Sequence, residues 1–350
     1  MIFAPDLCQA AHVVDRLTVL ADFYSPNILK KGWQMLSQEQ IDHFNTQGFL
    51  VVENLLCDDL LQRIHAEYEA KMDQLYKDWV SQKKVPAPTP EMNFWDKLER
   101  CTTGGFDWYQ PFDISLPASN ITEETPFHFG PATFDMITSQ RILDLVECLI
   151  GPEITSNPIQ HVRIKPPQKV VPKREARAHI VKTDWHQDMG VTLESADNTN
   201  MVTVWLAITD ATVENGCLQV VPGKRANLLP HCSQDGAQVA IRDRYLDGKA
   251  LPTPVKAGGA VIFHPMTPHS SLANTSDGYR WSFDLRYNVT GQPTGRSHFP
   301  EFVARSESNP KNELRDWQNW RDLWEQARLQ IAGAEHIAQH RWPTDGPYCA

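Results

Sequence analysis

Short apolar segments separated by turns fill residues 154–290 of this chain. Their composition predicts strands, and Glu214-Asn215-Gly216 is a turn between two of them. Many short strands joined by turns favour a sandwich or jelly roll over a parallel sheet. Nucleotide-binding folds lose support, because no glycine-rich phosphate loop follows any candidate strand. The candidate strands are residues 158–165, 202–208, 217–221, 259–264 and 281–289.

Helical patterns also occur on the N-terminal side of this β region. Residues 37–40 form a capping box, which predicts a short helix that ends at Gly48 and is followed by a strand. Asp58 or Asp59 begins a second helix, and a further helix is expected around residues 142–150. We therefore expect a mainly β protein with flanking helices.

A tryptophan stripe marks one more helix near the C-terminus. Trp317, Trp320 and Trp324 recur at helical spacing, after an Asn309-Pro310 pair that is typical of a helix start. Such a stripe is more typical of a core or an interface than of a ligand site. The sequence thus predicts one main domain with helical additions at both ends.

The composition is ordinary for a globular protein and excludes some partners. The chain has 350 residues, 41% of them hydrophobic, and a formal net charge of −10. We expect no nucleic acid partner, because phosphate binding needs a basic surface. We also expect no membrane partner, since no apolar run is long enough to span a bilayer and the N-terminus lacks a signal-peptide pattern. The oligomeric state stays open, and a homodimer is compatible with the sequence.

The cysteines predict a cellular compartment. There are seven, an odd number, and no two of them form a C-x-x-C pair. This pattern fits reduced thiols and argues against a disulfide framework or a zinc knuckle. We therefore expect a cytoplasmic protein.

The segment 183–189 carries the first candidate metal ligands. In an extended segment His186 and Asp188 point to the same face, because side chains alternate along a strand. One imidazole and one carboxylate can thus converge on one ion. The H-x-D motif alone is weak evidence, since it also arises by chance at polar strand ends. A second histidine from a distant strand would complete a facial triad that leaves positions open for a cosubstrate and O₂.

Downstream residues supply that histidine and a cation. The glycine-led strand around 258–264 is followed by two candidates, His264 and His269. Arg280 comes later, where a neighbouring strand can set its guanidinium near the metal. Arginine grips a carboxylate through two parallel hydrogen bonds, which a lysine cannot match. A small dicarboxylic keto acid could therefore chelate iron at one end and meet Arg280 at the other.

At this point the sequence resembles the phytanoyl-CoA dioxygenase family of Fe(II)/2-oxoglutarate-dependent oxygenases. The order and the spacing of the family motifs agree over roughly residues 37–290. The matching residues are Lys165-Pro166-Pro167, His186-Gln187-Asp188, Trp205, Asn215-Gly216-Cys217-Leu218, Pro222-Gly223, His269-Ser270-Ser271, Asn274, Ser276 and Arg280.

The resemblance implies a double-stranded β-helix core, of the jelly-roll or cupin-like type, and a role for each matched residue. His186, Asp188 and His269 match the iron ligands, and Arg280 matches the partner of a 2-oxoglutarate carboxylate. Ser271 and Trp205 match neighbours of that cosubstrate. His161 lies where the family can have a methionine, which leaves its role in cofactor binding open. His264 is then expected in the core or in support of the site, and His179 and His231 are left as solvated or structural.

The resemblance further implies Fe(II), 2-oxoglutarate and O₂ as cofactors and a small organic molecule as substrate. Hydroxylation is the expected reaction, with succinate and CO₂ as coproducts; desaturation, epoxidation and ring formation use the same triad. Halogenation is disfavoured because Asp188 keeps the carboxylate. A non-catalytic jelly-roll metal-binding module and a zinc hydrolase are the alternatives of a different class. Arg280 separates these readings, since neither needs a clamp for a keto acid.

We expect an N-terminal arm at 1–36, an oxygenase domain at 37–300 and a C-terminal helical extension at 301–350. Within the domain, 82–135 is expected to be irregular but ordered, because it alternates prolines with aromatic residues. It is either a lid over an apolar or ring-containing substrate or a loop that packs on its own core. The basic segment 169–182 is a solvated loop or a second lid that attracts an anionic substrate.

Overall fold

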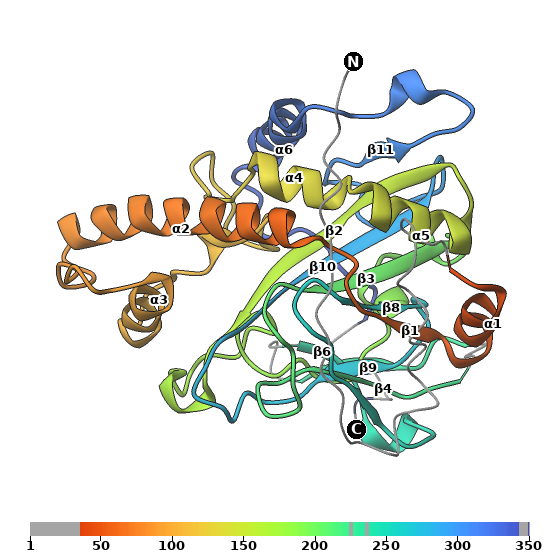
Figure 1. The fold of residues 1–350 in the computed structure, drawn as a ribbon, viewed down its shortest axis with the longest axis horizontal. Coiled ribbons are helices and arrows are strands. Elements are labelled where there is room, and N and C mark those ends of the chain that lie inside the picture. Colours follow the sequence, from red (N-terminus) through yellow and green to blue (C-terminus); the bar gives the residue numbers. More distant parts are fainter. Residues whose placement is uncertain (1–35, 224–226, 235–237, 343–348, 350) are drawn as a thin grey trace.

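The computed structural model describes residues 36–223, 227–234, 238–342 and 349. Its largest sheet has six strands in the order β1-β8-β3-β10-β2-β11, and a smaller sheet has the order β7-β4-β9. All named strand pairs are antiparallel. The predicted mainly β, jelly-roll fold is confirmed (Figure 1). The strands are β1 Phe49–Val52, β2 Ile154–Lys165, β3 Met201–Ala207, β4 Leu218–Val220, β5 His231–Gln234, β6 Gln238–Ile241, β7 Leu251–Thr253, β8 Ala260–Phe263, β9 His269–Ser271, β10 Arg280–Val289 and β11 Phe302–Arg305.

Most of the helices lie where the sequence predicts them. The capping box is present, with Ser37 and Gln40 exchanging hydrogen bonds, and Gly48 ends the first helix in the left-handed conformation with φ 80°. The helices are α1 Gln38–Gln47, α2 Asp58–Ser81, α3 Phe94–Thr103, α4 Pro131–Ile137, α5 Gln140–Ile150 and α6 Trp317–Ile331. No helix of the described residues is long and apolar enough to cross a membrane.

The large sheet is buried on both faces, and its two faces differ. On β3, Val202 and Val204 belong to the main core, which also includes residues of α2 and α5. Their neighbour Trp205 belongs to a second cluster with residues of the smaller sheet. Because strand side chains alternate, the second face is the interior of the jelly roll, and it can present polar groups to a ligand.

The C-terminal region is more than a helical extension. Trp320 and Trp324 are buried in the main core, so the prediction that the stripe is core is confirmed. Asp316 caps α6, whereas Asn309-Pro310 begins only a short 3₁₀ helix, Pro310–Asn312. In addition, β11 pairs with β2 and extends the large sheet.

The segment 82–135 is less irregular than expected, since it contains α3 and the start of α4. Several of its aromatic residues, including Trp108, Tyr109 and Phe112, are buried in the main core. The N-terminal arm lies outside the described residues, apart from Leu36.

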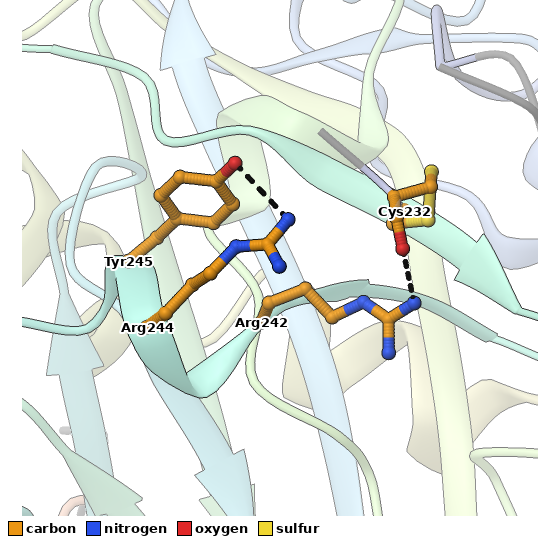
Figure 2. Close-up of a disulfide and its surroundings, with 5 residues drawn as sticks. Cys232, Arg242, Arg244 and Tyr245 are labelled. Atoms are coloured by element: carbon orange, nitrogen blue, oxygen red, sulfur yellow. Dashed lines mark hydrogen bonds between the residues drawn. A yellow bond between two sulfur atoms is a disulfide. The ribbon is translucent and has the colours of Figure 1, made fainter. Parts of the chain in front are cut away.

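One expectation about the cysteines is wrong. Cys232, in β5, forms a disulfide with Cys349, 117 residues later. Figure 2 shows this bond beside Arg242, whose Nη2 donates to the carbonyl oxygen of Cys349 (2.6 Å). The sequence offered no sign of the pair, because the two cysteines become neighbours only when the chain end returns to β5. The other described cysteines, Cys57, Cys101, Cys148 and Cys217, are free thiols as expected.

Candidate active site

The structure brings His186, Asp188 and His269 together in the interior of the jelly roll. The extended segment at His186 pairs with β9, and His186 and His269 exchange both backbone hydrogen bonds (2.9 and 3.0 Å). Both imidazole Nε2 atoms lie 3.8 Å from Asp188 Oδ1. One metal ion with ligand bonds of about 2.1 Å can bridge atoms at this separation. The three side chains are all buried.

The histidines are held in the form that binds a metal. His186 Nδ1 donates to the carbonyl oxygen of Asp184 (2.9 Å), and His269 Nδ1 donates to that of Thr267 (3.0 Å). These bonds leave each Nε2 lone pair directed at the centre. Burial, together with the neighbouring His269, lowers the pKa of His186 to about 3, and burial also lowers the pKa of His269. Both rings are therefore neutral ligands at physiological pH.

Asp188 is held as a carboxylate by two residues that the sequence did not single out. Arg286 Nη2, from β10, donates to Oδ1, and Thr203 Oγ1, from β3, donates to Oδ2. Burial alone would raise the pKa of Asp188, but the charge of Arg286, together with its hydrogen bond and the two neighbouring histidines, outweighs burial and holds the pKa below its usual range. The only sequence signal for these partners was their place on inward-facing positions of predicted strands.

Gln187, between the two ligands, anchors the motif to the segment at 227–231. Its backbone N–H donates to His231 Nε2 (2.9 Å), and His231 Nδ1 donates to the carbonyl oxygen of Leu229 (2.7 Å). The Gln187 side chain donates to the carbonyl oxygen of Met266 and accepts from Leu229 N (both 2.7 Å). His231 is therefore a buried positioning residue, within the structural role expected for it.

The short turn that follows Asp188 is supported from the C-terminal part of the chain. This turn is the 3₁₀ helix η3, Asp188–Val191. Trp342 Nε1 donates to the carbonyl oxygen of Gly190 (2.6 Å), and the Trp342 ring stacks on His231 at 5.2 Å. Arg341 donates to the carbonyl oxygens of Met189 and Thr192 (both 3.4 Å). The conformation of the Asp188 turn thus depends on residues more than 140 positions away.

A second cationic group lies at the start of β10. Arg280 is completely buried, its Nη1 donates to Ser282 Oγ (2.7 Å), and its guanidinium lies 5.0 Å from the centre of the Trp205 ring. Its Nε and Nη2 have no partner among the described residues. Burial, with the nearby charge of Arg163, lowers the pKa of Arg280 to about 10, so it stays charged. An unpartnered buried guanidinium fits a carboxylate.

Lys165 joins Arg280 directly across the strand pair β2–β10. Its Nζ donates to Ser271 Oγ (2.6 Å) and to the carbonyl oxygen of Leu272 (2.7 Å). Burial, and then the charge of Arg280, lowers the pKa of Lys165 well below its usual value. Arg280, Ser271 and Trp205, all predicted as cosubstrate neighbours, therefore lie together, and Lys165 is a further member.

Gly216 makes room for this lysine. Its φ is +90°, and a Cβ there would lie 2.6 Å from the carbonyl oxygen of Leu272 and 2.9 Å from Lys165 Cδ. Only glycine combines this backbone conformation with such a close approach.

His161 lies in a different polar group from Arg280. Its Nδ1 is 3.0 Å from Asp113 Oδ2, and its ring lies 4.5 Å from that of His179. Burial raises the pKa of Asp113 to about 6. The group neighbours the buried Arg163–Asp284 ion pair, since Asp284 pairs with His161 in the β2–β10 register. Among the residues that the structure describes, no hydrogen bond or ion pair joins His161 to the Arg280 group, so its cofactor role stays a prediction.

His264 is not the core or supporting residue that was expected. It is exposed, and its Nδ1 accepts from Met266 N (3.1 Å). The preceding residue, Phe263, faces the site with its ring 4.2 Å from that of His269. Because successive strand residues point to opposite faces, His264 must point away.

The comparisons with known proteins agree with this arrangement. The family model "Phytanoyl-CoA dioxygenase (PhyH)" matches residues 44–282. The chain is 27% identical over 260 residues to the peroxisomal phytanoyl-CoA dioxygenase of Rattus norvegicus, covering 72% of this chain and 68% of that protein. It is 26% identical over 289 residues to the enzyme of Homo sapiens, covering 80% and 75%. Among solved structures, the non-heme monooxygenase ThoJ has a TM-score of 0.50 at 20% identity over 83% of this chain and 97% of that one, which supports the fold.

The chemistry of the site decides whether the family's cofactors fit. Two neutral imidazole nitrogens and a carboxylate are the donor set of non-haem Fe(II) oxygenases. The orphaned guanidinium donors of Arg280 suit the free carboxylate of a keto acid. With a family match over more than half of its length, the chain belongs to the phytanoyl-CoA dioxygenase family and is a dioxygenase that depends on Fe(II), 2-oxoglutarate and O₂.

Proposed function

We propose that this enzyme hydroxylates a small organic molecule, with His186, Asp188 and His269 as the iron ligands and Arg280 as the carboxylate partner of 2-oxoglutarate. The observation that carries the proposal is the buried triad in one jelly-roll interior with a guanidinium that keeps two unpartnered donors. A zinc hydrolase or a metal-binding module has no use for such a buried clamp. When bound, Fe(II) supplies the activation of O₂ that couples decarboxylation of 2-oxoglutarate to oxidation of a C–H bond.

The protein residues orient and shield the reaction. Ser271 Oγ accepts from Lys165 and from the Thr183 backbone N–H (2.9 Å), which fixes the hydroxyl beside the cosubstrate pocket. Arg286 and Thr203 hold both oxygens of Asp188, so the carboxylate keeps one orientation. Because this carboxylate occupies the position that a halide would need, the site favours hydroxylation.

The test is turnover of the Fe(II)-loaded enzyme with 2-oxoglutarate and ¹⁸O₂ across a panel of candidate substrates. Hydroxylation predicts one labelled oxygen in the product, one in succinate, and release of CO₂. A product that has lost two hydrogens without gaining oxygen would instead assign desaturation or ring closure. Absence of succinate with every candidate, and also without substrate, would contradict the proposed cosubstrate.

A further inference from the structure

Two buried arginines near the Asp188 turn keep hydrogen-bond donors that none of the described residues accepts. Arg286 is 3% exposed and Arg296 is 5% exposed. The Nε of each has no partner among the described residues. Buried polar groups are nearly always hydrogen-bonded, and a buried charge without a counter-ion is especially costly. Orphaned donors of this kind therefore point to a ligand.

The two side chains are anchored at opposite ends of the same turn. Arg286 donates to Asp188 Oδ1 and to the carbonyl oxygen of Ile159 (3.0 Å). Arg296 Nη2 donates to the carbonyl oxygen of Val191 (2.8 Å). Since a 3₁₀ helix rises about 2 Å per residue, the two anchor points lie within about 8 Å of each other. The positive charge of Arg286 acts on Arg296, which indicates that the two guanidinium groups are neighbours, and Arg286 touches the proposed iron ligand Asp188.

The charges of this region do not balance. Arg286 forms an ion pair with Asp188, Arg163 with Asp284, and Arg341 with Asp197. Among the described residues, Arg296 has no carboxylate partner within ion-pair distance. Burial and the charge of Arg286 lower the pKa of Arg296 to about 9, which still leaves it protonated at neutral pH. The guanidinium of Arg296 therefore lacks a counter-ion among the described residues.

This anion is not the carboxylate of 2-oxoglutarate that Arg280 is proposed to bind. Arg280 and Arg286 are six residues apart on β10, which at about 3.3 Å per residue separates their backbones by about 20 Å. The proposed iron ligands lie at the Arg286 end, where Arg286 touches Asp188. The cosubstrate clamp and the two orphaned donors thus lie at different ends of the strand. The second carboxylate of 2-oxoglutarate is expected at the iron, so the test keeps 2-oxoglutarate saturating, and an acid that still binds supplies a separate anion.

We infer that Arg286 and Arg296 bind a carboxylate group of the substrate, an inference that rests on the proposed function. Each guanidinium offers one free Nε donor, and two single donors match the two oxygens of one carboxylate. A phosphate, with more oxygens and more charge, would leave acceptors unmatched. Because Arg286 also touches Asp188, the carboxylate binds within one side-chain length of the iron. The oxidised carbon is therefore only a few bonds away, and the substrate is a small carboxylic acid.

The experiment uses the full chain loaded with Mn(II) and saturating 2-oxoglutarate, which gives a complex that binds without turning over. Calorimetry first measures 2-oxoglutarate binding. The probes are then straight-chain acids from acetate to decanoate, benzoate and phenylacetate, each compared with its primary amide, and methyl phosphate. We expect at least one acid to bind at least tenfold more tightly than its amide, because only the acid supplies the counter-charge.

Two matched variants separate anion binding from support of the turn. Arg296→Gln should raise the Kd of the bound acid by about 10- to 100-fold and remove its advantage over the amide. Arg341→Gln also removes a contact to the turn, but Arg341 is already paired with Asp197, so the preference for the acid should persist. Arg296→Lys, which keeps the charge, should retain part of the preference.

The outcomes distinguish this inference from the function on which it rests. If 2-oxoglutarate does not bind, the proposed function fails and the inference fails with it. If 2-oxoglutarate binds but no acid is preferred over its amide, or if only methyl phosphate binds, the carboxylate assignment alone is overturned. Equal loss of the preference in Arg296→Gln and Arg341→Gln would show that Arg296 acts only by holding the turn.

Discussion

The two histidines after β8 have opposite environments, and this decides which one can bind iron. His269 is buried with its Nε2 facing Asp188, whereas His264 is exposed on the other side of the strand end. We expect His269→Ala, His186→Ala and Asp188→Ala each to abolish turnover and to weaken Fe(II) binding. His264→Ala should keep measurable activity. The check is Fe(II) titration together with succinate formation, and an inactive His264→Ala beside an active His269→Ala would refute the assignment.

Arg280 can be tested without disturbing the metal ligands. Its unpartnered Nε and Nη2 are suited to two bonds with one carboxylate, of which a lysine can reproduce at most part. We predict that Arg280→Lys raises the apparent constant for 2-oxoglutarate by about 10- to 100-fold, equivalent to about 1.5–3 kcal/mol. Fe(II) affinity serves as the control and should be retained. An unchanged constant would remove Arg280 from the cosubstrate site.

At the scale of the structural elements, Trp342 supports the metal site from outside the jelly roll. It donates to the carbonyl oxygen of Gly190 and covers the ring of His231, which in turn holds Gln187. Outer contacts of this kind are typically worth 10- to 100-fold in metal affinity. Trp342→Ala should therefore weaken Mn(II) binding by about tenfold and speed hydrogen exchange at 188–192. Trp317→Ala in helix α6, at a half-buried position with no contact to the Asp188 turn among the described residues, is the comparison variant. Equal effects of the two substitutions would disprove a specific support by Trp342.

The two segments predicted as lids meet in the structure, although their motion stays a prediction. A cavity of about 400 Å³ lies between them, lined by residues that include Phe106, Trp108 and Arg174. Arg177 forms an ion pair with Asp107 across the two segments (2.7 Å). We expect hydrogen exchange in 82–135 and 169–182 to slow when iron, 2-oxoglutarate and substrate are all bound, because closure excludes water. Helix α6 should not change; equal protection in both states would mean that these segments are ordinary core.

For the whole molecule, the Cys232–Cys349 disulfide closes a long loop. Closing a loop of 117 residues restricts the unfolded chain, and disulfides typically contribute about 2–4 kcal/mol to the free energy of unfolding. We predict that Cys349→Ser loses this amount in denaturant unfolding. Reductant should destabilise the wild type equally and leave Cys349→Ser unchanged; a wild type indifferent to reductant would contradict the prediction. Disulfides persist in oxidising compartments, so the cytoplasmic location remains an open prediction.

The local patterns of the sequence predicted much of the fold and the centre of the site. The capping box at Ser37, the alternation at His186 and Asp188, and the tryptophan stripe of α6 all depend on neighbours within one or two turns of chain. Backbone geometry converts such spacings directly into a shared face or a helix end. The family motifs extended this to His269 and Arg280, because their order along the chain matched a known fold.

Only the tertiary structure decided what surrounds that centre. Arg286 and Thr203 reach Asp188 from two other strands, and Trp342 reaches its turn from the opposite end of the chain. The exposure of His264 and the pairing of Cys232 with Cys349 are likewise absent from any local pattern. Strand periodicity says which residues share a face, but not which strands become neighbours. Burial, charge pairing and unpartnered donors are properties of the assembled interior, so they can be determined only once the strands are in place.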